Sequence, residues 1–185
     1  SILLKKFKAN MHIHTCLSPC SDWDMSPRKI VRQSLNIGLD IIAICDHNTA
    51  ENCGAVMREG ESRGLPVLPG IEICSKEEVH ILALFDKLDQ VLAMQDYVYA
   101  NLSGENQPEV FGYQVVANED DEVMGENPRL LIGATGLGLY DIVTKTHSLG
   151  GISLSSHVDR IAYGIIGQLG FIPADLNIDG VEVSY

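Results

Sequence analysis

The sequence predicts an α/β protein of the (β/α)-barrel type, and three observations support this prediction. Short apolar runs typical of buried strands alternate with segments that carry helix signals. Histidines and carboxylates stand at or just after the ends of several of these runs, as they do at the C-terminal face of such a barrel. The 185 residues, 45% of them hydrophobic, suffice for one well-buried domain, and no second domain is evident.

The expected elements follow one another in a regular order. Strands are predicted at residues 7–14, 40–45, 67–73, 79–85, 151–155 and 180–183, and helices at residues 27–38, 49–63, 88–102, 138–149 and 161–169. Ser26 is the expected N-cap of the first helix, with Pro27 at its first position. Asn48 and Thr49 are expected to cap the second helix.

A polar segment at about residues 103–131 breaks this regularity. It contains the acidic run 118–122 and, with seven acidic residues and one arginine, accounts for half of the net charge of −12. Its length and polarity predict a solvated surface insertion within a single domain, residues 1–185. A lid or a partner-binding flap over the site is the alternative interpretation.

Composition argues against some classes of partner. The net charge of −12 argues against bulk nucleic-acid binding, because neutralising phosphates needs clustered Lys and Arg. The five cysteines form no Cys-x-x-Cys pair and are odd in number, which indicates a reducing, cytoplasmic location. No apolar run approaches the roughly 20 residues of a membrane span, so no membrane partner is expected. The oligomeric state is left open.

The histidines are the strongest chemical signal in the chain. Most of them lie at or near the ends of predicted strands, and a glutamate lies within another strand; these candidate ligands are His12, His14, His47, Glu72, His80 and His157. Imidazoles and carboxylates are ligands of Zn²⁺, Mn²⁺ and Fe²⁺, so the pattern predicts a metal site without deciding which metal binds. The sixth histidine, His147, lies near the end of a predicted helix, where the helix dipole favours it, and is expected to be structural.

These residues occur in motifs that resemble the PHP (polymerase and histidinol phosphatase) superfamily, in order and over essentially the whole chain. The matching motifs are His12-Ile13-His14-Thr15, Asp46-His47-Asn48, Pro69-Gly70-Ile71-Glu72, Val79-His80-Ile81-Leu82 and Ser156-His157-Val158-Asp159-Arg160. The resemblance implies a distorted seven-stranded (β/α) barrel, the PHP barrel, with two to three divalent metal ions. It also implies a phosphoesterase, a hydrolase in which metal ions activate water.

The resemblance also implies a place for each ligand of the first two ions. His12 and His14 would bind the first ion. Glu72 would bridge the first and second ions. His80 and His157 would complete the second ion.

For the third ion, the resemblance implies His47 together with a residue shortly after the His-x-His motif. Asp22 and Asp24 compete for that place, and Asp22 is preferred by its distance from the following helix. Two further residues are candidate catalytic groups. Arg160 is expected to contact a substrate phosphate, and Asp46 to orient a ligating imidazole or move the leaving group's proton.

The chain departs from the family pattern after the last predicted strand. The family's Asp-x-His pair has no counterpart before Tyr185. We therefore expect a barrel that is incomplete at the C-terminus, with an exposed sheet edge, and one ligand fewer for the first and third ions. A catalytically impaired PHP domain that serves as a binding or regulatory module is thus one alternative function.

Hydrolysis of phosphoesters is the favoured function. The expected partner is a small phosphorylated substrate, a nucleotide or an oligonucleotide end, which suits the acidic composition better than a long duplex. An amidohydrolase is the second alternative, because these enzymes also begin with His-x-His; they typically need a bridging lysine, for which Lys76 is the nearest candidate. A soft metal on Cys16 and Cys20 is a minor alternative, since the two thiols have no partners at zinc-site spacing.

Overall fold

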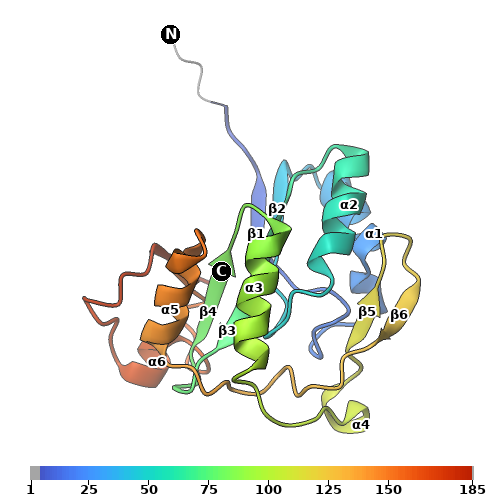
Figure 1. Ribbon diagram of the computed structural model, residues 1–185. Coiled ribbons are helices and arrows are strands. Elements are labelled where there is room, and N and C mark those ends of the chain that lie inside the picture. The colour runs from blue at the N-terminus through green and yellow to red at the C-terminus, as the bar shows by residue number, and fades with distance from the viewer. Residues whose placement is uncertain (1–4, 185) are drawn as a thin grey trace.

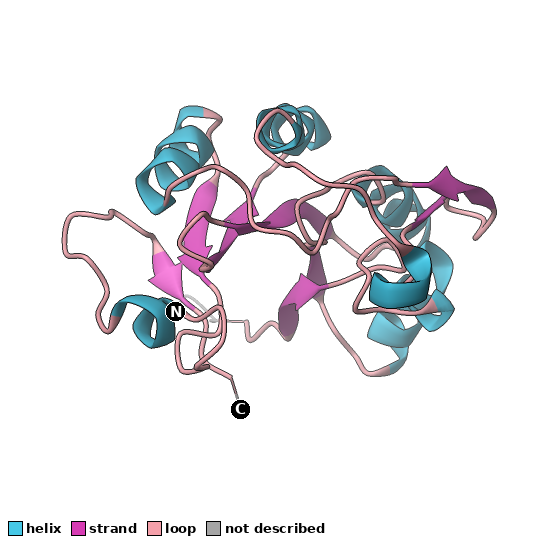
Figure 2. Cartoon of the chain, turned by 90° about the horizontal axis from the view of Figure 1, so that it is seen from below, coloured by secondary structure: helices cyan, strands magenta, loops and turns pink. Residues whose placement is uncertain are grey.

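The computed structural model describes residues 5–184 and shows one curled sheet with helices packed outside it (Figures 1 and 2). The sheet has the strand order β1-β2-β3-β4-β7-β8. Its strands are β1 (Ala9–Ile13), β2 (Ile41–Ile44), β3 (Val67–Cys74), β4 (His80–Leu84), β7 (Ile152–Ser155) and β8 (Gly180–Val181). The helices around it are α1 (Pro27–Asn36), α2 (Cys53–Arg63), α3 (Leu88–Tyr99), α5 (Leu139–Ser148) and α6 (Ile165–Leu169). Across residues 5–184, none of the helices has the length and apolar character needed to cross a membrane.

Strand direction departs from a regular (β/α) barrel at β4. The strands β1, β2 and β3 are parallel, and β7 and β8 are parallel, but β4 is antiparallel to both of its neighbours. The reason is the short turn between β3 and β4, residues 75–79, because a parallel connection needs a crossover of a dozen or more residues. The sheet is a curled half-barrel, consistent with the expected PHP and TIM-like architecture. The seven-strand count and the missing closing strand remain predictions.

Side chains on both faces of the curled sheet are buried, because successive residues of a strand point to opposite faces. On β2, Ile42 and Ile44 belong to the large core shared with the helices, whereas Ala43 belongs to a second, inner cluster with Leu82 and Leu84 of β4. This double burial explains why the strands read as continuous apolar runs. It also supplies a closed apolar base beneath the polar side chains at the strand ends.

The start of α2 differs from the prediction. The helix begins at Cys53 and its N-cap is Asn52, so the expected capping by Asn48 and Thr49 is wrong. Asn48 instead adopts a left-handed conformation (φ 52°), donates its amide to Leu131 O and Gly133 O, and accepts from the Cys74 amide. It joins the end of the polar segment to β3. Ser26 does precede α1, as predicted, but its side chain makes no capping hydrogen bond.

The polar segment at 103–131 forms small elements of its own: helix α4 (Pro108–Phe111) and a hairpin of β5 (Val115–Ala117) and β6 (Val123–Glu126). The hairpin lies beside α1 and α2 (Figure 1). Its acidic turn is attached there, because Arg28 donates to Asp120 and Asp121 and Arg58 donates to Glu119. The acidic run is therefore partly neutralised against two helices.

Candidate metal centre

Six predicted ligands converge at one edge of the half-barrel. Their positions are His12 in β1, His14 just after β1, His47 after β2, Glu72 in β3, His80 at the start of β4 and His157 after β7. The reversed direction of β4 explains how its first residue joins the others, which follow or end parallel strands. The structure thus brings together all the histidines predicted as ligands.

A single buried carboxylate lies at the centre of this group. Glu72 is 1% exposed. Its Oε1 contacts one nitrogen of each of three rings, and its Oε2 contacts one nitrogen of each of two others. These contacts are Oε1 to His80 Nδ1 (3.1 Å), His12 Nε2 (3.4 Å) and His157 Nε2 (3.4 Å), and Oε2 to His14 Nε2 (3.2 Å) and His47 Nδ1 (3.2 Å).

These spacings match the coordination shell of a divalent ion. With metal–ligand bonds of about 2.0–2.1 Å, neighbouring ligand atoms lie about 3.4 Å apart in a tetrahedron and about 2.9 Å apart in an octahedron. The carboxylate–imidazole distances, and the 2.9 Å between His12 Nε2 and His14 Nε2, all fall within this range. Five rings also exceed what one carboxylate can satisfy by hydrogen bonding. The residues therefore fit divalent metal ions.

Outer partners hold two of the rings with Nε2 directed at Glu72. His12 Nδ1 lies 3.0 and 3.1 Å from the two carboxylate oxygens of Glu182, and His14 Nδ1 lies 3.0 Å from Ser18 Oγ. A hydrogen on each Nδ1 leaves the Nε2 lone pair free for a metal. Sequence reasoning missed Glu182 and Ser18. The signal for Glu182 was a carboxylate in the last predicted strand, which is the position where the other ligands occur.

Asp46 lies behind this layer and contacts the rings through Ser18. Its Oδ1 accepts from Ser18 Oγ (2.6 Å) and from the Thr15 amide (2.7 Å), and its Oδ2 accepts from Thr15 Oγ1 (2.7 Å). Ser18 Oγ also accepts from the His47 amide at 3.1 Å. Burial raises the pKa of Asp46, although these donors oppose the shift. The geometry favours a positioning role for Asp46, exerted through Ser18.

The charge states of the cluster differ from ring to ring in the metal-free protein. Burial alone would lower the pKa of His12 and of His14, but hydrogen bonds outweigh it and raise these values to about 9 and about 10. The bonds are those of His12 to Glu182 and Glu72, and of His14 to Cys20 and Glu72. Burial lowers the pKa of His47 to about 3. Burial would raise the pKa of Glu72, yet hydrogen bonds from the surrounding rings hold it well below its usual value.

Of the predicted third-ion ligands, His47 belongs to the inner group, whereas the carboxylate candidates Asp22 and Asp24 lie outside it. Asp22 accepts the Asp24 amide at 2.8 Å and precedes the short 3-10 helix η1 (Trp23–Met25), and Asp24 pairs with Lys29. Their carboxylates border an open hollow next to His14. The preference for Asp22 over Asp24 remains a prediction.

A pocket of about 370 Å³ opens over the histidines. Besides the ligands, it is lined by Cys20, Ile132, Arg160, Ala162 and Tyr163. The Arg160 side chain is held by one hydrogen bond, from Nε to Ser184 Oγ at 2.8 Å. The Tyr163 ring stacks on His80, with ring centroids 4.5 Å apart. The pocket thus places a cation and an aromatic ring beside the candidate metal centre.

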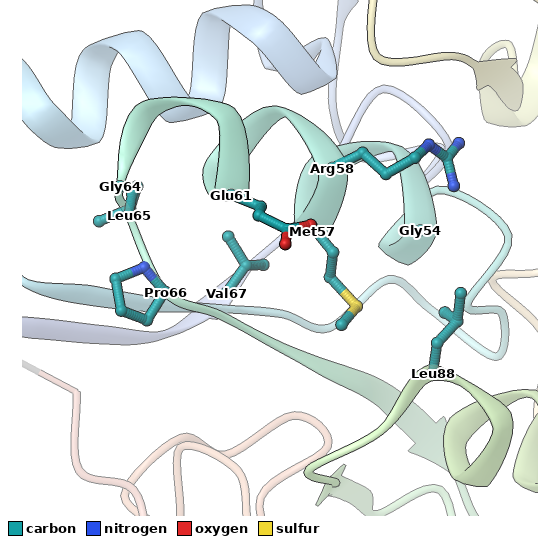
Figure 3. Close-up of a pocket in the computed structure, with 9 residues that line it drawn as sticks. All are labelled: Gly54, Met57, Arg58, Glu61, Gly64, Leu65, Pro66, Val67 and Leu88. Carbon is teal, nitrogen blue, oxygen red and sulfur yellow. The ribbon is translucent and has the colours of Figure 1, made fainter.

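Another pocket, of about 530 Å³, lies away from this centre and is shown in Figure 3. It is formed by α2, the following turn and the start of β3, and its walls are mainly apolar, including Met57, Val67 and Leu88. Arg58 and Glu61 are its charged residues. No convergent set of metal-ligating groups borders it among residues 5–184. The histidine pocket is therefore the candidate functional site.

His147 forms a separate and smaller cluster. Its Nε2 lies 2.8 Å from Asp179 Oδ2, which also accepts from the Ser153 amide at 2.7 Å. Ser153 Oγ and Asp179 Oδ2 both contact the same nitrogen of His147, Nε2. In a Ser-His-Asp triad the serine and the aspartate contact different ring nitrogens, so this cluster is not a triad. The contacts join the end of α5 to β7, as expected of a structural histidine.

No family model matches the chain. One curated relative is a 5'-3' exoribonuclease of Haemophilus influenzae, which is 31% identical over 84 residues. The match covers 43% of this chain and 30% of the exoribonuclease. The chain thus matches less than a third of the length of this relative.

Solved structures share the fold at low sequence identity. Endonuclease Q in complex with a 27-mer duplex carrying an abasic lesion has a TM-score of 0.67 and 16% identity, over 96% of this chain and 42% of that one. A protein assigned as a metal-dependent phosphoesterase from Bifidobacterium adolescentis has a TM-score of 0.57 and 18% identity, over 96% and 77%. An amidohydrolase from Chromobacterium violaceum has a TM-score of 0.59 and 15% identity, over 94% and 76%.

The fold implied by the resemblance to the PHP superfamily agrees with these neighbours, and so does the prediction of a hydrolase, since their names are those of a phosphoesterase and an endonuclease. The predicted partner is corrected. A small phosphorylated substrate or a nucleotide, without bulk nucleic-acid binding, was expected, but endonuclease Q is bound to a 27-mer duplex, which points to nucleic acid. Net charge misled the prediction because it averages the whole surface. Four of the 25 acidic residues, at positions 119–122, lie in the hairpin turn against α1 and α2 and do not line the histidine pocket.

Proposed function

We propose that this chain is the metal-dependent phosphodiesterase part of an enzyme that hydrolyses nucleic acid. The observation that carries the proposal is the buried Glu72 carboxylate surrounded by five imidazole nitrogens at 3.1–3.4 Å. The nuclease names of the exoribonuclease and endonuclease Q support the substrate class.

One set of residues would hold the metal ions, and another would hold the substrate. Bound divalent ions would supply the activation of water and the neutralisation of phosphoryl oxygens that this hydrolysis requires. Glu182 and Ser18 orient His12 and His14 through their Nδ1 atoms, so that the ligand atoms are placed before substrate arrives. Arg160 uses one nitrogen for Ser184, which leaves its terminal nitrogens available to a phosphate.

The pocket limits how much of a nucleic acid enters. Its volume of about 370 Å³ is near the lower end of the roughly 300–1,000 Å³ of small-molecule sites. We therefore expect one nucleotide at a time beside the ligands, either a strand terminus or a nucleotide turned out of a duplex. Tyr163, which lines the pocket and is 40% exposed, would contact its base or sugar.

The test is cleavage of labelled strands by the purified chain with Mn²⁺ or Zn²⁺ added. Linear RNA, linear DNA and circular strands of the same sequence separate attack at an end from internal cleavage. We expect metal-dependent cleavage of the linear RNA or DNA that His80→Ala abolishes. Metal binding without cleavage of any of these substrates would favour the binding or regulatory module instead.

The amidohydrolase alternative has support from one structural neighbour, at the level of the fold alone. Lys76, the candidate bridging lysine, does not line the histidine pocket; its amide donates to Leu137 O next to α5. A panel of amide substrates, run beside the nucleic acids, tests it directly. Turnover of an amide with no cleavage of nucleic acid would overturn the proposed function.

A further inference from the structure

Cys20 stands apart from the other cysteines of the described chain. Cys16, Cys45, Cys53 and Cys74 are buried, and burial raises the pKa of each of these thiols. Cys20 is exposed and borders the histidine pocket. Its Sγ lies 3.6 Å from His14 Nδ1.

One ligand atom each of Cys20, His14 and His47 lie within 4.8 Å of one another. The His47 side chain is itself 9% exposed, and it makes no hydrogen bond within residues 5–184 beyond its 3.2 Å contact with Glu72. The other ring nitrogen, Nε2, has no hydrogen-bond partner within residues 5–184, and the ring lines the pocket, so this nitrogen is available to a ligand. This observation concerns His47 and is independent of the thiol.

We propose that the Cys20 thiolate is a metal ligand, together with His47, at the outer side of the centre next to His14. This inference rests on the proposed metal-dependent function. It gives Cys20 the ligand role that the sequence analysis assigned to Asp22 or Asp24. Asp22 is engaged by the Asp24 amide, and Asp24 by Lys29, whereas Cys20 faces the rings.

A thiolate ligand would give the outer metal position a preference for particular metals. Thiolate is a soft ligand that suits Zn²⁺ and Co²⁺, whereas the inner carboxylate–imidazole group suits Mn²⁺ and Fe²⁺ as well. The outer position therefore discriminates among ions that the inner group accepts. An exposed thiol ligand also makes that position sensitive to alkylation in the metal-free protein.

Co²⁺ is the probe, because a cobalt–thiolate bond gives a charge-transfer absorption in the near-ultraviolet that cobalt bound only to nitrogen and oxygen lacks. The metal-free chain is titrated with Co²⁺ as the parent, Cys20→Ser, Cys16→Ala and Glu72→Ala. We expect the charge-transfer band in the parent and in Cys16→Ala, and its loss in Cys20→Ser with visible-region cobalt bands retained. Circular dichroism of each variant checks that it is folded.

Each result bears on one proposal. Cobalt bands without a charge-transfer band in the parent, removed by Glu72→Ala, would refute the Cys20 ligand and leave the inner centre standing. A charge-transfer band that survives Cys20→Ser would assign the sulfur to another cysteine and also refute the proposal. Absence of any cobalt binding by the folded parent would refute the metal centre, and with it the proposed function. Protection of a single thiol from iodoacetamide by Co²⁺, lost in Cys20→Ser, is the second expected readout.

Discussion

Two histidine–carboxylate clusters of this protein contain the same kinds of side chain but differ in the number of histidine rings around each carboxylate. Around Glu72, five rings face one carboxylate that is 1% exposed. Around Asp179, one ring and the backbone amide of Ser153 face one carboxylate whose side chain is 40% exposed. The second cluster satisfies its own hydrogen bonds. The first has more ring nitrogens than the carboxylate can pair.

This difference separates a site from a structural contact. Buried polar groups in folded proteins nearly always find partners, and a group that lacks them indicates a ligand or a catalytic role. The buried His157 Nδ1 has no hydrogen-bond partner in the described part of the chain, so the first cluster leaves a ring nitrogen unpaired where the second leaves none.

Glu72→Gln is expected to have the largest effect. The change keeps the shape of the side chain but removes the charge that five rings share, so metal affinity should fall by more than about 100-fold, since losing a group that merely orients a ligand already costs roughly 10–100-fold. Elemental analysis of the dialysed protein measures the bound metal. Full retention of metal in a folded Glu72→Gln variant would show that Glu72 is not a ligand.

The pH dependence of metal binding is expected to be the next largest effect. At neutral pH the metal-free protein carries protons on His12 and His14, whose pKa values are raised to about 9 and about 10. A divalent ion needs neutral ring nitrogens, so its binding should release about two protons and strengthen as the pH rises from about 6 to about 8. Calorimetry in two buffers of different ionisation enthalpy counts the protons.

The stability of the metal-free fold should change in the opposite direction: the free energy of unfolding should fall as the pH rises. A ring whose pKa is raised on folding stabilises the fold fully below its ordinary value of 6.5, and this contribution is lost as the pH rises through about 9 to about 10.

Glu182→Gln removes one hydrogen-bond partner of His12 and is the matched variant for the calorimetry. Metal binding to this variant should release fewer protons than metal binding to the parent. Equal proton release by parent and variant would contradict the assigned cause.

His147→Gln is expected to have the smallest effect. Its pair with Asp179 is more than a third exposed, so the free energy of unfolding should fall by about 0–1 kcal/mol. Metal content should not change, because the pair lies outside the Glu72 group. Chemical denaturation and elemental analysis measure the two quantities. Loss of metal in this variant would break the distinction between the clusters.

Sequence reasoning located most strands and the inner ligands because both leave local signals. Continuous apolar runs mark strands buried on two faces, and the ligating histidines lie within these runs or next to their ends. The direction of β4 carried no such signal, since a run of apolar residues looks the same in either direction. Its short connection to β3, residues 75–79, was the clue that the two strands are antiparallel.

The outer partners of the ligands were harder to predict. Glu182 contacts His12 from 170 residues away in the sequence, and Ser18 reaches His14 from an irregular loop only four residues away. Asn48 looked like a helix cap because its residue type favours caps, yet tertiary contacts use it to hold Leu131 and Gly133. Single-sequence patterns do not encode such pairings.

The antiparallel pairing of β3 and β4 has a consequence for how the protein reaches its native state. In the six-stranded sheet, Glu72 and His80 are separated by only eight residues, and the two strands are paired from Cys74↔His80 to Gly70↔Leu84. Pairings between residues close in sequence close small loops and form fast, whereas the pairings of β1, β7 and β8 must wait for distant segments. Glu72 and His80 therefore belong to the part of the sheet that is expected to form first. The other histidines join them later, as the distant strands pair.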